Sequence, residues 1–348
     1  MQPRKLDAAG LVWAPGVKLG VAKDSPFWDV AAGLPVLGVA QVHSMSDAIS
    51  TQARIGSGAV ASIHSWDVSE LKPWLDQTDA ASLTVNRPTV NALIERLPSG
   101  SWGRSGIGVT PLLGGPHELV TLGSWRVRKG TQSSTLHLRG LDPKVQRLIE
   151  LAQHELEYEA FDMVRRAALA DTLSWRTDLG VVRDAIGLEV ERNLLRYWPV
   201  ATHIRAAEDS PLDELVRVVA AALLVNAPIE VSSGVGLPTT VLEFLQSQGV
   251  KVTVERDDDW FDRIAAHGAK VGSETADRLR LIGGDRVRVA EWLGGLDRTA
   301  LWAEPVTMAG PVELLSLLRE QSVSIRAHRH GMAALPPGLA EWLRKLGR

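Results

Sequence analysis

The sequence contains no cysteine among its 348 residues. This absence excludes disulfide bridges, thiolate metal sites and any mechanism in which this chain supplies a cysteine nucleophile. The nine histidines are scattered and form no HExxH motif. Only His328 and His330 lie two positions apart, where a strand would place them on one face, and a ligand site is the weaker interpretation of that pair. We therefore expect no metal site and no zinc enzyme.

Long apolar runs and an excess of one charge are also missing. No apolar stretch approaches the roughly 18 residues of a membrane-spanning helix, and residues 1–7 lack the apolar core of a signal peptide. The 41 acidic residues nearly balance the 38 basic ones, so the net charge is −3. There is no basic stripe of the kind that binds nucleic acid. We expect a cytoplasmic protein with neither a membrane nor a nucleic-acid partner.

What the sequence does contain is enough apolar material for folded cores. Hydrophobic residues make up 45% of the chain and charged residues 23%, which excludes wholesale disorder. At about 100–200 residues per domain, the length predicts two domains or three. Aromatic residues are few, and 12 of them are tryptophan, which we interpret as packing residues.

The first 130 residues predict short elements followed by a long loop. We expect strands at 36–42, 59–64 and 83–86, and helices at 46–53 and 67–77. From residue 88 to 116 the chain is rich in glycine, serine and proline, and such a long loop in a compact domain is usually functional. Residues 131–142 are polar and mark a boundary. Residues 143–170 then predict one amphipathic helix.

From residue 200 onward, strands and helices alternate. We expect helices at 212–224, 239–248, 258–267, 286–293 and 312–321, and strands at 229–233, 251–255, 279–282, 300–302 and 323–326. Strict alternation with short connections predicts a parallel, doubly wound sheet. The fold class is therefore α/β.

Two glycine-bearing turns follow expected strands. Residues 233–236 lie between a strand and a helix, where a phosphate would sit on the helix N-terminus, and Glu255 lies near the distance at which an acid binds ribose. The dinucleotide fingerprint needs a third glycine, but Thr239 stands there, so a plain turn is favoured. Residues 281–285 are likewise interpreted as a tight turn.

Two further enzyme motifs are absent. Residues 100–106 resemble a phosphate loop, but Pro98 occupies the place of the first glycine that the motif requires, so a nucleotide triphosphatase is rejected. No G-x-S-x-G sequence is present, so a hydrolase has no positive signal. The residues by themselves indicate a two-domain α/β protein with a glycine-rich loop at 88–116.

Several stretches, taken in order, carry a family resemblance. The pattern comprises 11–17, 34–39, 55–65, Asn86-Arg87 leading to 98–108, then 114–116, 122–125, 281–285, 310–315 and 318–329. Together they resemble the C-terminal part of the aldehyde dehydrogenase superfamily, in its L-glutamate γ-semialdehyde (1-pyrroline-5-carboxylate) dehydrogenase branch. The resemblance is greatest to the actinobacterial and proline-utilisation-A-type proteins with an extra C-terminal domain.

The resemblance implies a domain organisation and a limit on activity. Residues 1–130 correspond to the C-terminal part of the catalytic domain with its oligomerisation segment, 131–199 to a linker and helical segment, and 200–348 to a Rossmann-like C-terminal domain. The family's cofactor domain, general-base glutamate and nucleophilic cysteine would all precede residue 1. Because the family forms a thiohemiacetal on that cysteine before hydride transfer to NAD, we expect a truncated chain that is inactive and binds no cofactor alone.

The positions that correspond to the family's site are also altered. The glutamate that holds the nicotinamide ribose corresponds to Ala31, and the phenylalanine near the nicotinamide corresponds to Gly33, so no cofactor-binding residue is retained. The substrate-anchor loop corresponds to Asn91, Ala92, Ser99 and Gly100. In it, Asn91 replaces a glycine and Ser99 replaces an apolar phenylalanine worth roughly 2–3 kcal/mol of burial. These changes favour a loss of selection for turnover.

Three functions remain open on the sequence. The chain is a non-catalytic remnant, able to form a homo-oligomer through 119–128; or it is half of a split dehydrogenase completed by a cysteine-bearing partner chain; or 143–348 is an interaction module that caps another dehydrogenase. An exposed apolar patch where the missing domain would pack favours the second, and a polar surface there favours the first.

Overall fold

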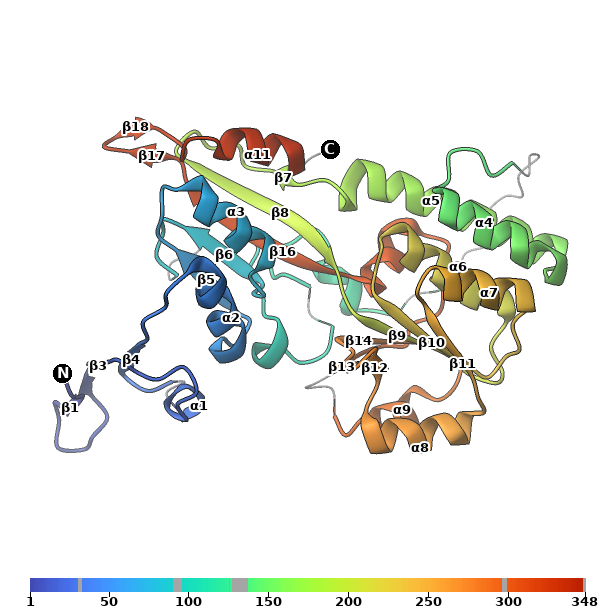
Figure 1. Cartoon of the computed structure of the whole chain (residues 1–348), viewed down its shortest axis with the longest axis horizontal. Helices are drawn as coiled ribbons and strands as arrows, with labels where there is room; N and C mark the ends of the chain where they lie inside the picture. Colours follow the sequence, from blue (N-terminus) through green and yellow to red (C-terminus); the bar gives the residue numbers. More distant parts are fainter. Residues whose placement is uncertain are drawn as a thin grey trace.

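The computed structural model describes residues 1–30, 33–89, 96–109, 111–124, 126, 137–295 and 299–346. The described residues form two five-stranded β-sheets and four pairs of short strands. Figure 1 shows two long strands that run from the first large sheet toward the second, and an N-terminal arm, residues 1–30 and 33–42, that lies apart from both. The α/β class predicted from the sequence is confirmed. In the described ranges, no helix is both long and apolar enough to cross a bilayer.

The N-terminal third forms short elements, as expected. They are β1 (Arg4–Lys5), β2 (Trp13–Ala14), β3 (Gly16–Leu19), α1 (Phe27–Val30), β4 (Val36–Val39), α2 (Met45–Ile55), β5 (Val60–Ile63), α3 (Val68–Gln77), β6 (Ser82–Val85), η1 (Gly103–Ser105) and η2 (Glu118–Thr121). Side-chain caps fix two of the helix starts: the Ser44 hydroxyl accepts from the Asp47 amide at 3.1 Å, and the Asp67 carboxylate accepts from the Ser69 amide at 2.8 Å.

The middle of the chain differs from expectation in two ways. It holds α4 (Pro143–Ala152), η3 (Gln153–Glu155), α5 (Tyr158–Ser174), the π-helical η4 (Trp175–Leu179), β7 (Arg183–Asp184) and β8 (Glu191–Pro199). The single helix expected at 143–170 is therefore broken in two, where Leu156 leaves the helical conformation. The nine-residue strand β8 was not expected within a linker and helical segment.

The last third contains the second sheet and the return of the chain to the first. Its elements are β9 (Thr202–Ala206), α6 (Leu212–Leu224), β10 (Ile229–Ser233), α7 (Thr239–Ser247), β11 (Lys251–Val254), α8 (Asp257–His267), β12 (Lys270–Val271), β13 (Glu274–Thr275), β14 (Arg278–Ile282), α9 (Arg286–Trp292), β15 (Ala300–Trp302), α10 (Gly310–Glu313), η5 (Leu314–Ser316), β16 (Leu318–Arg326), β17 (His328–Arg329), β18 (Met332–Ala333) and α11 (Leu339–Leu346).

The second sheet is the doubly wound sheet predicted from the alternation. Its five strands are all parallel, in the order β11-β10-β9-β14-β15. The order reverses between β9 and β14, which is the point where open α/β sheets place ligands. The expected elements between 212 and 302 agree with the structure to within one or two residues.

The first sheet is built from distant parts of the chain, in the order β5-β6-β16-β8-β7. Strand β16 lies parallel to β6, with Ser322 opposite Ser82, and antiparallel to β8 over nine residue pairs. The helix expected at 312–321 is wrong, because α10 ends at Glu313 and the chain extends from Leu318. The strand expected at 323–326 exists, but it belongs to this sheet and not to the doubly wound one.

The core explains why β16 is a strand. Val323 and Ile325 pack with Leu83 and Val85 under α3, whereas Leu318 packs into the larger core beneath α4, α5 and α6. This one strand therefore contributes to the hydrophobic core of both sheets. An apolar run at 314–318 fits a helix locally, but the two-sided burial along β16 selects the extended chain.

Gln321 is the polar centre of β16 and is 1% exposed. Its side-chain oxygen accepts from Arg196 Nε at 2.8 Å and from Trp198 Nε1 at 2.9 Å, and its nitrogen donates to the Ala80 carbonyl at 2.7 Å. We expect Gln321→Ala to lower the free energy of unfolding by about 2–4 kcal/mol, because it leaves the buried Arg196 without this acceptor. Urea unfolding of this variant and of Gln246→Ala, an exposed position on α7, measures the effect; equal losses in both would contradict it.

His203 in β9 makes the stability of the folded chain depend on pH. Burial lowers the pKa of His203 to about 4; its Nδ1 lies 2.9 Å from the Lys270 carbonyl, and its Nε2 accepts from Trp260 Nε1 at 3.2 Å. Below about pH 6.5, His203 binds a proton in the unfolded chain but stays neutral in the folded chain. The free energy of unfolding therefore falls as the pH falls toward 4. We expect a loss of about 2 kcal/mol from this group between pH 7 and pH 5.

The measurement is urea unfolding at both pH values for the wild type and for His203→Gln, whose amide oxygen replaces Nε2 as an acceptor. The variant should lose less stability than the wild type over this interval. An identical pH dependence in the two proteins would show that His203 is not the group responsible.

Candidate functional site

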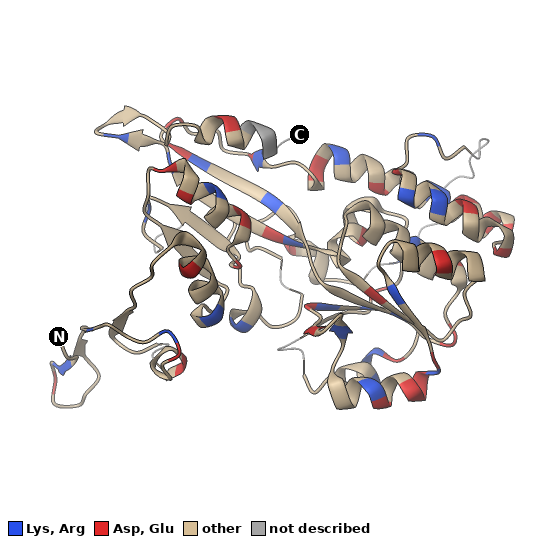
Figure 2. Cartoon of the chain, viewed as in Figure 1, with Lys and Arg blue, Asp and Glu red and all other residues tan. Residues whose placement is uncertain are grey.

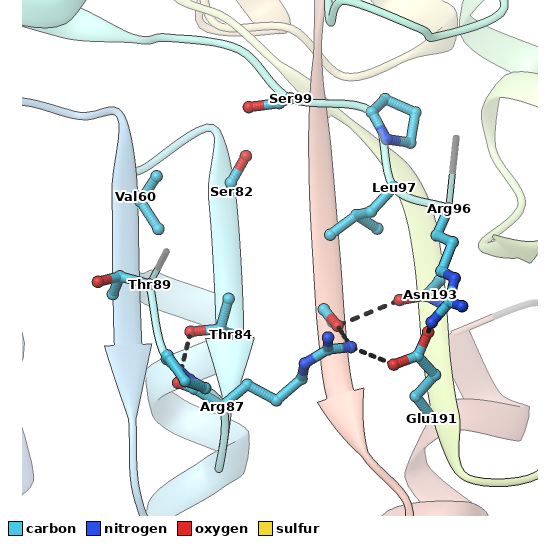
Figure 3. A pocket seen from close by; sticks show the side chains of 13 residues that line it. Val60, Ser82, Thr84, Arg87, Thr89, Arg96, Leu97, Ser99, Glu191 and Asn193 are labelled. Atoms are coloured by element: carbon cyan, nitrogen blue, oxygen red, sulfur yellow. Dashed lines mark hydrogen bonds and ion pairs between the residues drawn. The ribbon is translucent and has the colours of Figure 1, made fainter. Parts of the chain in front are cut away.

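A pocket of about 110 Å³ lies against the first sheet, where the segments on either side of residues 90–95 cross its strands (Figure 3). The sheet supplies the floor and these two segments supply the wall. The lining residues are Val60, Ser82, Thr84, Arg87, Pro88, Thr89, Arg96, Leu97, Pro98, Ser99, Glu191, Asn193 and Ser324. Their side chains are mainly hydroxyls, amides and charged groups.

Glu191, at the start of β8, organises the charges of this pocket. Its carboxylate lies 2.5 Å from Arg87 Nη1, 3.5 Å from Arg96 Nη1 and 3.0 Å from Asn193 Nδ2. Partial burial disfavours ionisation, but Asn193 and the two guanidinium groups outweigh it and lower the pKa of Glu191. Arg87 also donates to the Ser324 hydroxyl at 2.7 Å, so the network joins the loop after β6 to both long strands.

The described side chains of this pocket are suited to binding a carboxylate. Two guanidinium groups face one carboxylate, which leaves one positive charge for an anionic ligand. Ser82, Thr84, Ser99 and Ser324 offer hydroxyls, and among the described lining residues there is no histidine or lysine beside them. In the described ranges, no group of three or more metal-ligating side chains is present either.

The anchor-loop residues expected from the sequence are only partly placed. Asn91 and Ala92 lie outside the described residues. Ser99 lines the pocket, and its amide and carbonyl pair with Leu113 at 3.1 and 2.8 Å. Gly100 lies beside the pocket wall, where a Cβ would meet Leu112 Cδ2 at 2.4 Å, so only glycine fits without a shift.

Of the two positions expected to have lost cofactor contacts, Ala31 is outside the described residues. Gly33 occupies an exposed turn between α1 and β4 with a φ of +79°, and a Cβ there would meet nothing within 4 Å. The expected assembly segment 119–128 is described only at 119–124 and 126.

At the carboxyl edge of the second sheet, acidic side chains accept hydrogen bonds from backbone amides that could otherwise bind a phosphate. The backbone amides of Gly284, Glu208 and Asp257 are taken by the carboxylates of Asp209, Asp257 and Glu208, at 3.2, 3.4 and 3.1 Å. These are amides of the kind that hold phosphate in dinucleotide-binding folds.

The turn at 233–236 also has little room for a ligand. A Cβ at Gly234 would meet the Glu208 amide at 2.6 Å, and the Glu255 carboxylate is bound by Arg263 and Ser232 at 3.1 and 2.7 Å. The acid that would bind ribose is therefore already occupied. The geometry agrees with the plain turn that the sequence favours.

Sequence reasoning missed Glu191, Asn193 and Ser324. The signal available in 191–199 was the pair of aromatic residues Tyr197 and Trp198, which are enriched in strands. The charges of Glu191, Arg192 and Arg196 obscured it. Nothing in the local sequence indicates that β8 and β16 meet.

Comparisons with known proteins place the chain in context. Residues 2–120 match the model of the aldehyde dehydrogenase family. Comparison with curated proteins gives no significant match. The structure matches proline utilization A (PutA) from Corynebacterium freiburgense with a TM-score of 0.71 and 28% identity, covering 94% of this chain and 29% of that one.

Two weaker structural likenesses have TM-scores too low to establish a common fold. Betaine aldehyde dehydrogenase from Staphylococcus aureus, in complex with NAD+, gives a TM-score of 0.34 and 13% identity over 45% of this chain and 35% of that one. PutA from Bdellovibrio bacteriovorus gives 0.31 and 12% over 47% of this chain and 21% of that one.

We expect Glu191→Ala to lower the free energy of unfolding by about 1–3 kcal/mol, because Arg87 and Asn193 lose their shared acceptor in a mostly buried place. Chemical unfolding measures the change. Glu189→Ala is the matched control, since Glu189 is exposed two residues earlier and should change stability by less than about 0.5 kcal/mol. Equal effects would show that the network contributes nothing to stability.

Proposed function

We propose that this chain, with its aldehyde dehydrogenase family domain, is one half of a PutA-like L-glutamate γ-semialdehyde dehydrogenase and is inactive alone. A cysteine-bearing partner chain completes it. The family domain at 2–120 and the likeness to PutA support the kind of enzyme. The absence of cysteine supports the inactivity, because the chemistry of this family needs a thiolate.

The observation that carries the proposal is the exposed apolar surface of the N-terminal arm, residues 1–42. Leu11, Leu19 and Leu37 are 84%, 74% and 61% exposed, and none of the hydrophobic clusters of the described residues includes a residue before Met45. The arm stands apart from the rest of the molecule in Figure 1.

The N-terminal arm has too few strands to be stable by itself in water. Its strands β3 and β4 form a parallel sheet of only two strands, and a two-stranded unit is marginal in water without further packing. The register of this pair places Leu19, Leu37 and Val39 on one face, and adjacent exposed apolar side chains of this kind mark an interaction site. A remnant without partners would be expected to present a polar surface here, so the arm favours a completed assembly.

The polar pocket is the part of the site that this chain would contribute. Its guanidinium groups and hydroxyls suit the carboxylate of glutamate semialdehyde. The partner would contribute the nucleophilic thiol, the general base and the NAD site. Because Gly33 and Ser99 replace apolar family residues near the cofactor and the substrate, turnover in the completed enzyme should be slow.

The experiment is recovery of the tagged chain from its native host, followed by an assay of NADH formation from glutamate semialdehyde and NAD. We expect the chain alone to be inactive and the eluate to contain a cysteine-bearing dehydrogenase chain and to be active. Leu37→Glu should weaken capture of that chain about tenfold or more, since it removes apolar contact at the interface. Leu173→Glu, equally exposed on α5, is the control and should leave capture unchanged.

Three results would overturn this proposal. Activity of the isolated chain would show that the cysteine chemistry is not required. An inactive eluate that holds only this chain would favour the non-catalytic remnant. Capture of a dehydrogenase that is fully active without this chain would favour the interaction module.

A further inference from the structure

A second hollow, of about 310 Å³, lies at the carboxyl ends of three parallel strands of the first sheet. His64 and Trp66 follow β5, Asn86 follows β6, and Arg326 ends β16. Because β6 is parallel to both β5 and β16, these ends meet at one edge. The carboxyl edge of parallel strands is where open α/β sheets place their ligands.

Most of the side chains that line this hollow are basic. The hollow is lined by His64, Trp66, Asn86, Arg326, His328, Arg329 and His330, with no acidic residue among them. In the described part of the chain, neither Arg326 nor Arg329 takes part in a salt bridge. This contrasts with the rest of the molecule, where acidic and basic residues are interspersed (Figure 2) and the net charge is −3.

The acidic side chains around this edge have partners of their own. Asp67 accepts from the Ser69 amide at 2.8 Å, and the Glu70 carboxylate accepts from the Ser65 hydroxyl at 2.6 Å. Glu191 is the cross-strand partner of Arg326, but its carboxylate binds Arg87, Arg96 and Asn193 in the pocket described above. The charge at the edge is therefore not neutralised from within the sheet.

The backbone holds these side chains in place. Asn86 adopts a φ of +56°, and its Nδ2 donates to the Ser65 carbonyl at 2.7 Å, which joins the ends of β5 and β6. The guanidinium of Arg329 lies 5.1 Å from the centre of the Trp66 ring, so the ring supports the charge at the wall. His330 occupies the turn of the β17–β18 hairpin with a φ of +52°, which corrects the extended strand considered for His328 and His330.

The chemistry of the lining selects the class of ligand. A cation is disfavoured, since the described residues hold no metal-ligating group of three and the hollow contains two arginines. Guanidinium groups match the oxygens of a phosphate in geometry as well as charge. A nucleic acid would need a basic surface well beyond one hollow, and the acidic net charge argues against it.

We propose that this hollow binds a small phosphate-bearing anion through Arg326 and Arg329, with the histidines and Asn86 completing the polar wall. The site is separate from the pocket behind Glu191 and does not depend on the dehydrogenase assignment. It lies where β16 returns to the N-terminal sheet, so an anion bound there would tie three segments of the chain together.

The test is isothermal titration calorimetry of the full chain with sodium pyrophosphate at low ionic strength. We expect saturable binding with one site per chain, weakened about tenfold by Arg326→Gln and by Arg329→Gln. Arg147→Gln, an exposed position on α4 far from the hollow, is the control and should bind like the wild type. Thermal unfolding without ligand verifies that each variant is folded, which matters most for Arg329 because it packs on Trp66.

Absence of saturable binding would overturn the proposal, as would equal weakening in all three variants, which would indicate general charge attraction. Tighter binding of a short DNA duplex than of pyrophosphate would assign the surface to nucleic acid instead. The activity assay of the completed dehydrogenase is independent of all these readings, so failure of one proposal leaves the other standing.

Discussion

The pairing of β16 with β6 on one side and β8 on the other is the constraint on which the remaining structure depends. It joins residues about 240 positions apart, with Ser322 opposite Ser82 and its hydroxyl donating to that of Ser82 at 3.0 Å. Gln321 then links Arg196 in β8 to the Ala80 carbonyl just before β6. Without this strand, the first sheet would consist of two short pairs with no common core.

The same strand also fixes the segment that precedes it and the loop that the sequence marks as functional. The Arg278 guanidinium, which belongs to the second sheet, donates to the carbonyls of Leu315 and Leu318 at 2.5 and 2.9 Å. Glu320 accepts from the Leu112 amide at 2.7 Å and lies 2.8 Å from His117 Nδ1. Because the Glu320 carboxylate is buried and contacts both Leu112 and His117, it holds the glycine-rich loop against β16.

The extent to which the sequence predicts this molecule follows from the range of the contacts involved. The strands and helices that the sequence predicts from 212 to 302 match the structure closely, since each apolar face packs on its neighbour in the chain and caps such as Asp285 mark the helix starts. The central strand β9 and the β12–β13 pair were not predicted. Strands β8 and β16 are missed or misassigned because their partners lie far away in sequence. The polar residues of β8 and β16 have no partners nearby in the sequence, because they hydrogen-bond to one another across the sheet.

The residues of the candidate site likewise include some that the sequence predicts and some that depend on long-range strand pairing. Ser99 was found by its place in a family pattern, whereas Glu191, Asn193 and Ser324 reach the pocket only through the β8–β16 pairing. A family pattern reports what residues do in relatives, and it cannot report contacts made by strands whose pairing is not local.

The two parallel edges of this molecule show that topology alone does not decide binding. The second sheet has the strand order of a nucleotide-binding fold, yet carboxylates occupy the amides of Gly284 and Asp257 that a phosphate would need. The first sheet lacks that order, yet the hollow at its carboxyl edge is lined by Arg326 and Arg329 and by no acidic residue of the described chain. A fold supplies the place for a ligand, and the charges at the strand ends decide whether a phosphate is attracted or replaced. By that criterion the edge at β16 suits a phosphate-bearing ligand better than the doubly wound sheet does.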